Sequence, residues 1–409
     1  MPHDKLESMC ALELEALKQA GTAKGRETVI TGIIPPAGDH GPRYLLEGAG
    51  DKPFLRMNSN SYLGLSLQCE VQEAEEHAVR AYGTGPGAVR FISGTWAPHV
   101  ALEARLAAFH DRQGAMIFSS AYATVMGVLP ALITAETAVI SDELNHNCII
   151  NAMRLARPKA RYIYPHLDME ALAAQLDQVV QTCQRVLIVS DGIFSMRGDH
   201  APLADIVQLA KRYDEHCAEN VLVLIDDSHG VGALGATGRG TEEYTGCEDV
   251  DVLVATLGKA IGVNGGYVVA SRVITDYLRE KSPFYIYSNP ITPGEAAAAK
   301  CALDIIDSAR GLALLSHLRD MTARFERGLV ALGFETIPGE HPVVPLMVRD
   351  TARTSALVEH LQANGVLATG LNYPVVPRGD EEIRFQISAD HTAADIDAAL
   401  MVLAQFARA

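Results

Sequence analysis

Several signatures of other protein classes are missing from this chain of 409 residues. The seven cysteines are odd in number, widely spaced and without a C-x-x-C pair, which argues against a disulfide framework or a zinc site and favours a reducing cytoplasm. Lys and Arg total 34 against 50 Asp and Glu, and this net charge of −16 disfavours binding to nucleic acid or to an anionic membrane. The start, MPHDKLESMC, lacks the apolar region of a signal peptide.

One uncharged stretch, residues 114–135, is long enough to span a bilayer. It contains Ser119, Ser120, Tyr122, Thr124 and Pro130, which are polar or helix-interrupting residues. The stretch therefore predicts a buried strand, a polar turn and a helix, and we expect no membrane span.

From about residue 57, short apolar runs alternate with longer amphipathic ones, and no internal repeat is visible. The predicted strands are AMIF, TAVIS, ARYIY, RVLIVSDG, NVLVLIDDSHG, DVLVATLGK and GGYVVAS. Segments such as MEALAAQLDQVVQT and LADIVQLAKRYDEH lie between them and have helical periodicity. Continuous apolar strands alternating with helices predict an α/β domain with a mostly parallel sheet that is covered on both faces.

The chain ends in a region of different pattern. A long helical stretch begins near residue 294, and VVPLMVRD, SALVEHLQANG, IRFQIS and DIDAALMVLAQFA follow as short strands and helices. We therefore expect three parts: an N-terminal helix and connecting segment (1–56), a large α/β domain (57–293) and a smaller α+β domain (294–409).

Two strand ends carry groups capable of chemistry. In LIDDSHG, Asp226, Asp227 and His229 follow an apolar strand, where open α/β sheets bind ligands. Taken alone, such an Asp is equally typical of a helix N-cap. In DVLVATLGKA, Lys259 follows the next strand; it is either a solvated lysine or a desolvated amine that can form a Schiff base. The pattern is not a Walker A loop, because Leu253 and Ala260 occupy positions that the loop reserves for Gly and Ser or Thr.

Together these two motifs favour pyridoxal phosphate (PLP) chemistry. A carboxylate keeps the pyridine nitrogen of this cofactor protonated, and a lysine binds its aldehyde. A phosphate site is then needed, and SSAYATVMG after the strand AMIF offers backbone N–H groups of Ala121 and Tyr122 at a helix start. The alternative for this segment is an ordinary serine N-cap.

The ordered segments NSYLGL, VRFISGT, SDELNHNCII, SDGIFSMRGD, IDDSHGVGALGATGRG and TLGKAIG resemble the α-oxoamine synthases over nearly the whole chain. This family of PLP enzymes includes glycine C-acetyltransferase (2-amino-3-ketobutyrate CoA ligase), 5-aminolevulinate synthase, 8-amino-7-oxononanoate synthase and serine palmitoyltransferase. NYPVVPRGDEEIRFQISADHT and SDELNHNCIINAMRLARPKARYIY most resemble glycine C-acetyltransferase. The resemblance implies a fold-type I PLP-dependent transferase, with a mostly parallel seven-stranded sheet in the large domain.

The same resemblance assigns roles around the cofactor ring. It makes Lys259 the lysine that binds the cofactor aldehyde and Asp226 the partner of the pyridinium nitrogen. It places His229 and Ser195 at the phenolic oxygen and His146 against the ring face. Without it, His146 and Ser195 would be interpreted as turn residues.

For the phosphate, the resemblance implies the N–H groups of Ala121 and Tyr122, assisted by Thr256. It also implies Tyr287 and Ser288, in a segment that a second subunit contributes. A homodimer with shared active sites is therefore expected from the resemblance.

For the substrate, the resemblance assigns Arg384 to the amino-acid carboxylate and Asn60 to a position close to the substrate. Without it, Arg384 would be a surface arginine and Asn60 a turn residue. The implied reaction joins a small amino acid, glycine favoured, to an acyl-CoA, with or without decarboxylation. No metal is expected.

Departures from glycine C-acetyltransferases leave the acyl group open: Ser61 replaces a second asparagine, SSAY replaces Ser-Ser-Cys-Phe, and Pro290 replaces a serine. Alanine or serine with a long-chain or carrier-bound acyl donor is the alternative, as is another fold-type I enzyme such as an aldolase or aminotransferase.

Overall fold

The computed structural model describes residues 3–20, 22–23, 25–247, 249–373 and 375–407. The chain divides into two compact units, which are treated separately. The large unit comprises Asn60–Thr322 and Gly339–Pro342, and the small unit comprises Met1–Ser59, Ala323–Pro338 and Val343–Ala409.

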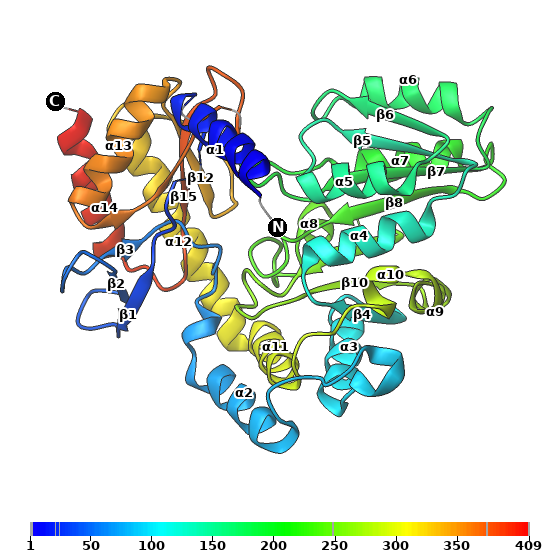
Figure 1. Cartoon of the computed structure of the whole chain (residues 1–409), viewed down its shortest axis with the longest axis horizontal. Helices are drawn as coiled ribbons and strands as arrows, with labels where there is room; N and C mark the ends of the chain where they lie inside the picture. Colours follow the sequence, from blue (N-terminus) through cyan, green and yellow to red (C-terminus); the bar gives the residue numbers. More distant parts are fainter. Residues whose placement is uncertain (1–2, 21, 24, 248, 374, 408–409) are drawn as a thin grey trace. The chain divides into compact units, whose positions relative to one another are not determined.

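The large unit is built on a seven-stranded sheet, as the sequence predicts (Figure 1). Its strands are β4 (Gly114–Phe118), β5 (Thr137–Asp142), β6 (Ala160–Tyr164), β7 (Arg185–Asp191), β8 (Val221–Asp226), β9 (Val252–Thr256) and β10 (Gly266–Ala270), in the spatial order β4-β10-β9-β8-β7-β5-β6. β10 alone runs antiparallel to its neighbours, β4 and β9. The short turn from β9 into β10 causes this reversal, because a parallel connection needs a crossover of a dozen or more residues.

Helices cover both faces of this sheet. The helical segments of the large unit are η1 (Leu65–Leu67), α2 (Cys69–Tyr82), η2 (Arg90–Gly94), α3 (Ala97–Phe109), α4 (Ala121–Leu132), α5 (Asn147–Ala156), α6 (Met169–Val179), α7 (Leu203–Asp214), α8 (Thr241–Thr245), α9 (Arg272–Lys281), α10 (Pro283–Ile286) and α11 (Pro293–Ile306), and α12 (Ala309–Ala331) begins in it.

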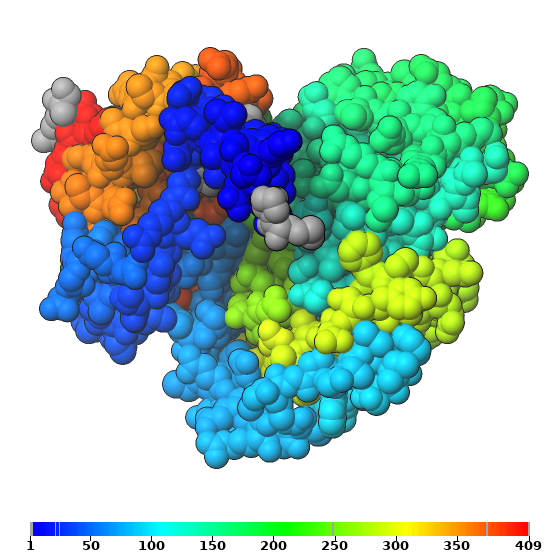
Figure 2. Space-filling view, in the orientation of Figure 1, coloured from blue at the N-terminus to red at the C-terminus, as the bar shows by residue number. Residues whose placement is uncertain are grey.

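Successive residues of the central strands point to opposite faces of the sheet and pack into two different hydrophobic cores. Val186 and Ile188 of β7 pack with α6 and α7, whereas Leu187 and Val189 pack with α4 and α5. This alternation explains why the strands read as continuous apolar runs. In the space-filling view, the side chains of α4 and α5 hide the strands behind them (Figure 2).

The uncharged stretch 114–135 forms β4, a turn at Ser119 and Ser120, and α4, as predicted. Among the described residues, no helix is long and apolar enough to cross a membrane.

The small unit joins the two ends of the sequence. Its elements are α1 (Asp4–Gln19), β1 (Ile30–Ile34), β2 (Arg43–Leu46), β3 (Leu55–Arg56), β11 (Glu335–Thr336), β12 (Val343–Met347), α13 (Thr351–Ala363), β13 (Val366–Leu367), β14 (Thr369–Leu371), β15 (Glu382–Gln386) and α14 (Ala393–Ala407), together with the end of α12. Its main sheet is antiparallel, in the order β11-β12-β15-β14, and β3 pairs in parallel with β13.

The boundaries of these units differ from the predicted domain boundaries, which lie at residues 56 and 293. The N-terminal segment belongs to the small unit, because β3 hydrogen-bonds to β13. Helix α11 and most of α12 belong to the large unit, where α11 packs on α2 and α3.

A buried carboxylate fixes the strand that leads into the polar turn. Glu103 on α3 accepts both guanidinium nitrogens of Arg90 at 3.1 Å and one of Arg279 at 3.0 Å. Its Oε1 also accepts the backbone N–H of Ile117 in β4 at 3.1 Å. This network ties η2, α3 and α9 to β4.

We expect Glu103→Ala to lower the free energy of unfolding of the apoprotein by about 3–5 kcal/mol, because it leaves the buried guanidinium group of Arg90 and the partly buried one of Arg279 without their carboxylate. Urea denaturation followed by circular dichroism measures the change. The matched control is Glu76→Ala, which removes the exposed partner of Arg80 on α2 and should leave the midpoint unchanged. Equal midpoints for the two variants would contradict this role of Glu103.

Candidate active site

A pocket opens at the carboxyl ends of the parallel strands. It holds about 370 Å³ of empty space, part of it open to solvent. Its lining residues are Ala121, Tyr122, His146, Cys148, Asp191, Ile193, Ser195, Asp226, Ser228, His229 and Lys259. Seven of these are among the predicted site residues, including Lys259 and Asp226.

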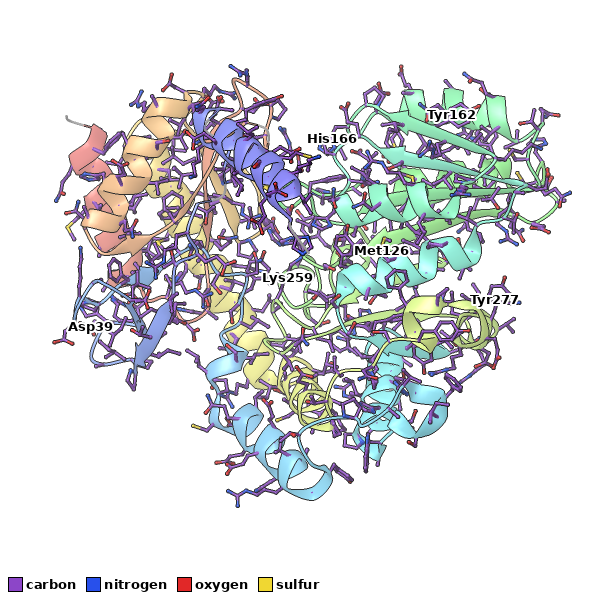
Figure 3. All side chains as sticks on the ribbon, viewed as in Figure 1. Asp39, Met126, Tyr162, His166, Lys259 and Tyr277 are labelled. Carbon is purple, nitrogen blue, oxygen red and sulfur yellow. The ribbon has the colours of Figure 1, made fainter. Side chains whose placement is uncertain are left out.

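Lys259 lies in the turn between β9 and β10 (Figure 3). Backbone hydrogen bonds close this turn: the N–H of Leu257 donates to Gly265 O at 2.9 Å and that of Gly262 to Lys259 O at 3.0 Å. The Thr256 hydroxyl donates to Gly265 O at 3.1 Å and accepts the N–H of Gly258 at 3.0 Å. The backbone that carries the Lys259 amine is therefore held from both strands.

Two aspartates end neighbouring strands at the pocket. Asp191 and Asp226 are register partners of β7 and β8, and both are buried. Burial and the nearby Asp226 carboxylate raise the pKa of Asp191 well above the usual aspartate range, although the N–H of His146 donates to Asp191 Oδ2 at 2.8 Å. Asp226 Oδ1 accepts the N–H of Ser228 at 3.1 Å. The raised pKa favours the protonated form of Asp191. The Asp226 carboxyl lines the same pocket, where a ring cation would meet it.

His146 stands at the start of α5. Its Nδ1 accepts the backbone N–H of Cys148 at 3.2 Å, which leaves Nε2 as the protonated nitrogen of the neutral ring. Burial lowers the pKa of His146, and the charge of Lys259 lowers it further against the opposing effect of Asp226. A neutral imidazole at this point is suited to packing on an aromatic face. The Cys148 thiol, whose pKa burial raises, remains protonated and donates to Asp226 Oδ2 at 3.8 Å.

His229 is held by groups far away in the sequence. Its Nδ1 lies 2.7 Å from the Tyr62 hydroxyl, which in turn donates to Asn60 Oδ1 at 3.3 Å. His341 Nε2 donates to the backbone oxygen of His229 at 2.9 Å. Because Tyr62 gives its proton to Asn60, it accepts one from His229 Nδ1. Asn60 is thus connected to the pocket through Tyr62.

The first turn of α4 forms a cradle for an anion. Ser120 caps the helix by accepting the N–H of Ala123 at 3.0 Å, and the first N–H groups of a helix have no partner within it. Gly266 of β10 lies against this turn, and a Cβ at this position would be 2.3 Å from the nitrogen of Ala121. The absence of a side chain at 266 therefore keeps the cradle accessible.

These residues fit PLP. The cradle suits a phosphate, Lys259 supplies an amine for an aldehyde, and Asp226 supplies a carboxylate for a pyridinium nitrogen. The Ser228 hydroxyl lines the same pocket and is buried without a hydrogen-bond partner among the described residues. A buried hydroxyl of this kind is costly unless a ligand or water satisfies it.

Other predicted residues lie outside the pocket lining. The Thr256 hydroxyl is engaged in the turn before Lys259. Tyr287 is 76% exposed and Ser288 is half-buried, in the turn after α10, and their expected role is in a second subunit. Arg384 is half-buried in β15 of the small unit, in register with Pro345 and Thr369. The roles of these four residues stay predictions, as do the roles of Asn60 and of the seven predicted residues that line the pocket.

Four lining residues were missed by the sequence reasoning: Cys148, Asp191, Ile193 and Ser228. A signal existed for Asp191, because it ends the apolar run RVLIVSD as Asp226 ends VLVLID. Cys148 and Ser228 each lie two residues after a predicted site residue.

A histidine outside the pocket secures the loop that carries Ile193 and Ser195. His166, after β6, has Nδ1 3.0 Å from Asp142 Oδ1 and Nε2 3.2 Å from Asp199 Oδ2. Its ring meets Phe194 edge-on, with centroids 4.4 Å apart. Since carboxylates only accept, both ring nitrogens donate and the ring is an imidazolium.

We expect the free energy of unfolding to fall as the pH rises in the alkaline range, because the His166 imidazolium loses its proton there. Burial opposes the charge, but Asp142 and Asp199 outweigh it and raise the pKa of His166 to about 9. The other charged groups here are Glu143, which accepts the backbone N–H of His166, and Arg197, which donates to Asp199. The contribution of His166 is therefore complete below its unfolded pKa near 6.5 and is lost as the pH rises through 9.

The measurement is the imidazole titration by NMR, with the unfolding midpoint of wild type and His166→Gln compared at pH 7 and pH 10. The variant should be less stable at pH 7, and the difference should shrink at pH 10. A titration midpoint below 7 would contradict the two-carboxylate geometry.

The comparisons with known proteins agree with this site. The family model for aminotransferase class I and II matches residues 52–403. The chain is 38% identical to an 8-amino-7-oxononanoate synthase of Geobacter metallireducens, with 96% of each chain covered. It is 40% identical to the mitochondrial 2-amino-3-ketobutyrate coenzyme A ligase of Homo sapiens, with 94% of this chain and 88% of the relative covered.

Among solved structures, an SPT with a PLP internal aldimine superimposes with a TM-score of 0.87 at 25% identity, covering 100% of this chain and 98% of the other. Serine palmitoyltransferase of Sphingomonas wittichii has a TM-score of 0.88 at 24% identity, with the same coverage, and shares the fold. These matches and the assembled pocket place the chain in the aminotransferase class I and II family and, within it, among the PLP-dependent α-oxoamine synthases.

Proposed function

We propose that the protein condenses a small amino acid, glycine favoured, with an acyl-CoA thioester and releases CoA. The product is a 2-amino-3-oxo acid, or an α-aminoketone when the carboxylate is lost. The observation that supports this most is the pocket in which Lys259, Asp226 and the α4 cradle face a common space.

Each residue has a chemical task in this proposal. When bound, PLP supplies a protonated ring that accepts the electrons left on the amino-acid Cα after deprotonation. Asp226 pairs with the ring nitrogen, and the amine of Lys259 takes the Cα proton. His229 and Ser195 hydrogen-bond at the phenolic edge, and His146 covers one face against water, which would return a proton to Cα.

The guanidinium group of Arg384 holds the substrate carboxylate through two parallel hydrogen bonds, which fixes the plane of the amino acid. Asn60 lies near the substrate in the same proposal. The new carbon–carbon bond joins Cα to the acyl carbon of the thioester. The carbon–sulfur bond breaks, and CoA leaves as the thiol.

A second candidate uses alanine or serine with a longer or carrier-bound acyl group. The relatives named 8-amino-7-oxononanoate synthase favour it, because they match as closely as those named 2-amino-3-ketobutyrate ligase. Thiol release measured with acyl thioesters of increasing length, each combined with glycine, alanine and serine, distinguishes the two. Transamination or retro-aldol cleavage without thiol release would instead indicate another fold-type I activity.

We also propose a homodimer with shared sites. Phe91 and Ile92 in η2 are each 65% exposed, and Tyr287, directly after α10, is 76% exposed. Helix α10 packs against η2, and exposed apolar side chains of this size are typical of a protein interface. A second copy covering these side chains would bring its Tyr287 and Ser288 to the phosphate. Sedimentation of the holoenzyme and of Phe91→Ser tests this assembly.

We expect Lys259→Ala to lose the visible absorbance of PLP bound through its aldehyde, and with it the covalent attachment that borohydride reduction makes permanent. Turnover should fall at least about 100-fold, because the variant lacks both the amine for the aldehyde and the base. Lys281→Ala, at the exposed end of α9, is the matched control and should keep both. Retained borohydride fixation in Lys259→Ala would refute the assignment.

We expect Arg384→Ala to raise the KM for the amino acid about 10- to 100-fold, since a charge-assisted pair contributes about 1.5–3 kcal/mol. The KM for the acyl thioester should change little. Steady-state kinetics with each substrate varied in turn give both values, and Arg353→Ala, which replaces an exposed residue of α13, serves as the control. An unchanged amino-acid KM would remove Arg384 from the site.

A further inference from the structure

Two loops that carry pocket residues are joined by one side chain, His166, which follows β6 (Figure 3). One loop leads from β5 into α5 and carries His146, and the other follows β7 and carries Ser195. His166 Nδ1 lies 3.0 Å from Asp142 Oδ1 at the start of the first loop, and its Nε2 lies 3.2 Å from Asp199 Oδ2 in the second. His166, Asp142 and Asp199 are called the clamp below.

Asp142 shapes the first loop. It is the last residue of β5, and its side chain is buried. Its Oδ1 also accepts the N–H of Leu144 at 2.8 Å, and its backbone oxygen accepts the N–H of Asn145 at 3.3 Å. His146 follows directly and caps the start of α5. The Asp142 carboxylate therefore sets the path of the backbone that leads to His146.

Asp199 closes the second loop. Its backbone oxygen accepts the N–H of Phe194 at 3.0 Å, and the Phe194 oxygen accepts the N–H of Gly198 at 2.9 Å. Ser195 lies inside this turn, and the His166 ring packs edge-on against Phe194. A displacement of the Asp199 carboxylate away from His166 therefore moves the backbone that carries Ser195.

Only a charged ring can hold both arms of the clamp. Carboxylates accept hydrogen bonds and donate none, so an imidazolium, with two N–H groups, satisfies Asp142 and Asp199 together. A neutral imidazole has one N–H, and its other nitrogen would turn a lone pair toward a carboxylate. One arm then opens, and two negative charges remain on either side of an uncharged ring.

From this arrangement we propose that His166 is a positioning residue for bound PLP: its charged ring joins the two loops and so holds His146 and Ser195 in their places around the cofactor. The inference concerns cofactor binding and is independent of which amino acid or acyl group the enzyme uses. Such a coupling is reciprocal. If the protonated clamp favours PLP, bound PLP favours the proton on His166 by the same factor.

The charged groups around the ring set the pH range of this coupling. Burial opposes the charge, but the two carboxylates of the clamp outweigh it and raise the pKa of His166 to about 9. Glu143 accepts the backbone N–H of His166, and Arg197 donates to the second carboxylate of the clamp. Tyr164 stays neutral, because burial and the nearby Asp142 raise its pKa. The clamp is therefore closed at neutral pH, and its contribution to PLP affinity is lost as the pH rises through about 9.

The first measurement is the dissociation constant of PLP, obtained by absorbance titration of the apoprotein. We expect His166→Gln to bind PLP about fivefold or more weakly than wild type at pH 7, and less than about twofold more weakly at pH 10. Both proteins keep Lys259, so the titration of its amine cancels from the ratio. The matched control is His40→Gln, which removes another histidine beside a carboxylate, that of Asp395 in the small unit, and should leave the ratio near one at both pH values.

The second measurement uses the unmodified chain, so it does not depend on whether a variant folds. The His166 imidazole is titrated by NMR in the apoprotein and in the holoenzyme, and bound PLP should raise its pKa by about 0.7 unit, the counterpart of a fivefold coupling. A histidine that only stabilises the fold would weaken PLP binding equally at both pH values and would not respond to the cofactor. An equal ratio at pH 7 and pH 10, or a His166 pKa that PLP leaves unchanged, would therefore overturn the proposal. Neither measurement uses a thioester, so a failure of the proposed condensation is a separate result.

Discussion

The shared edge at which parallel strands end is the constraint on which the site depends. β7, β8 and β9 run in the same direction, so Asp191, Asp226 and the turn that carries Lys259 meet without any long-range folding of loops. This proximity has an electrostatic cost, because two carboxyls at neighbouring strand ends cannot both ionise easily. Burial and the neighbouring Asp226 raise the pKa of Asp191, which favours its protonated form, and the N–H of Ser228 donates to Asp226.

Around that edge, hydrogen bonds and close packing set the directions of the pocket side chains. Tyr62 and His341 fix His229, the Cys148 N–H selects the tautomer of His146, and Gly266 lets β10 approach α4 closely. His166 secures the loop of Ser195 from outside the pocket. The chemistry of a bulky planar cofactor demands such rigidity, because small displacements of the reacting groups are costly.

Sequence reasoning identified the parts of this site that depend on local order. Lys259, Asp226 and His229 follow apolar runs directly, so strand, strand end and side chain could be predicted together. That Asp191 and Asp226 lie side by side follows from the order of the strands in the sheet. No local sequence pattern determines that order. Tyr62 is 167 residues from His229, and its hydrogen bond comes from tertiary packing alone. The unit boundaries were misplaced for a similar reason: β3 joins β13 through pairing between distant segments, and the helical stretch from 294 breaks at Asp307 and Ser308.

The hairpin between β9 and β10 has one more consequence. A lysine on a long crossover could shift with its loop, but the Cα of Lys259 is anchored by two strands and the hydrogen bonds that close their turn. In the proposed reaction, the amine would change from holding the cofactor aldehyde to accepting the Cα proton by rotation about its own four-carbon stem. The backbone would then act as a stationary pivot, and the length of one side chain would set the distance over which the amine can act.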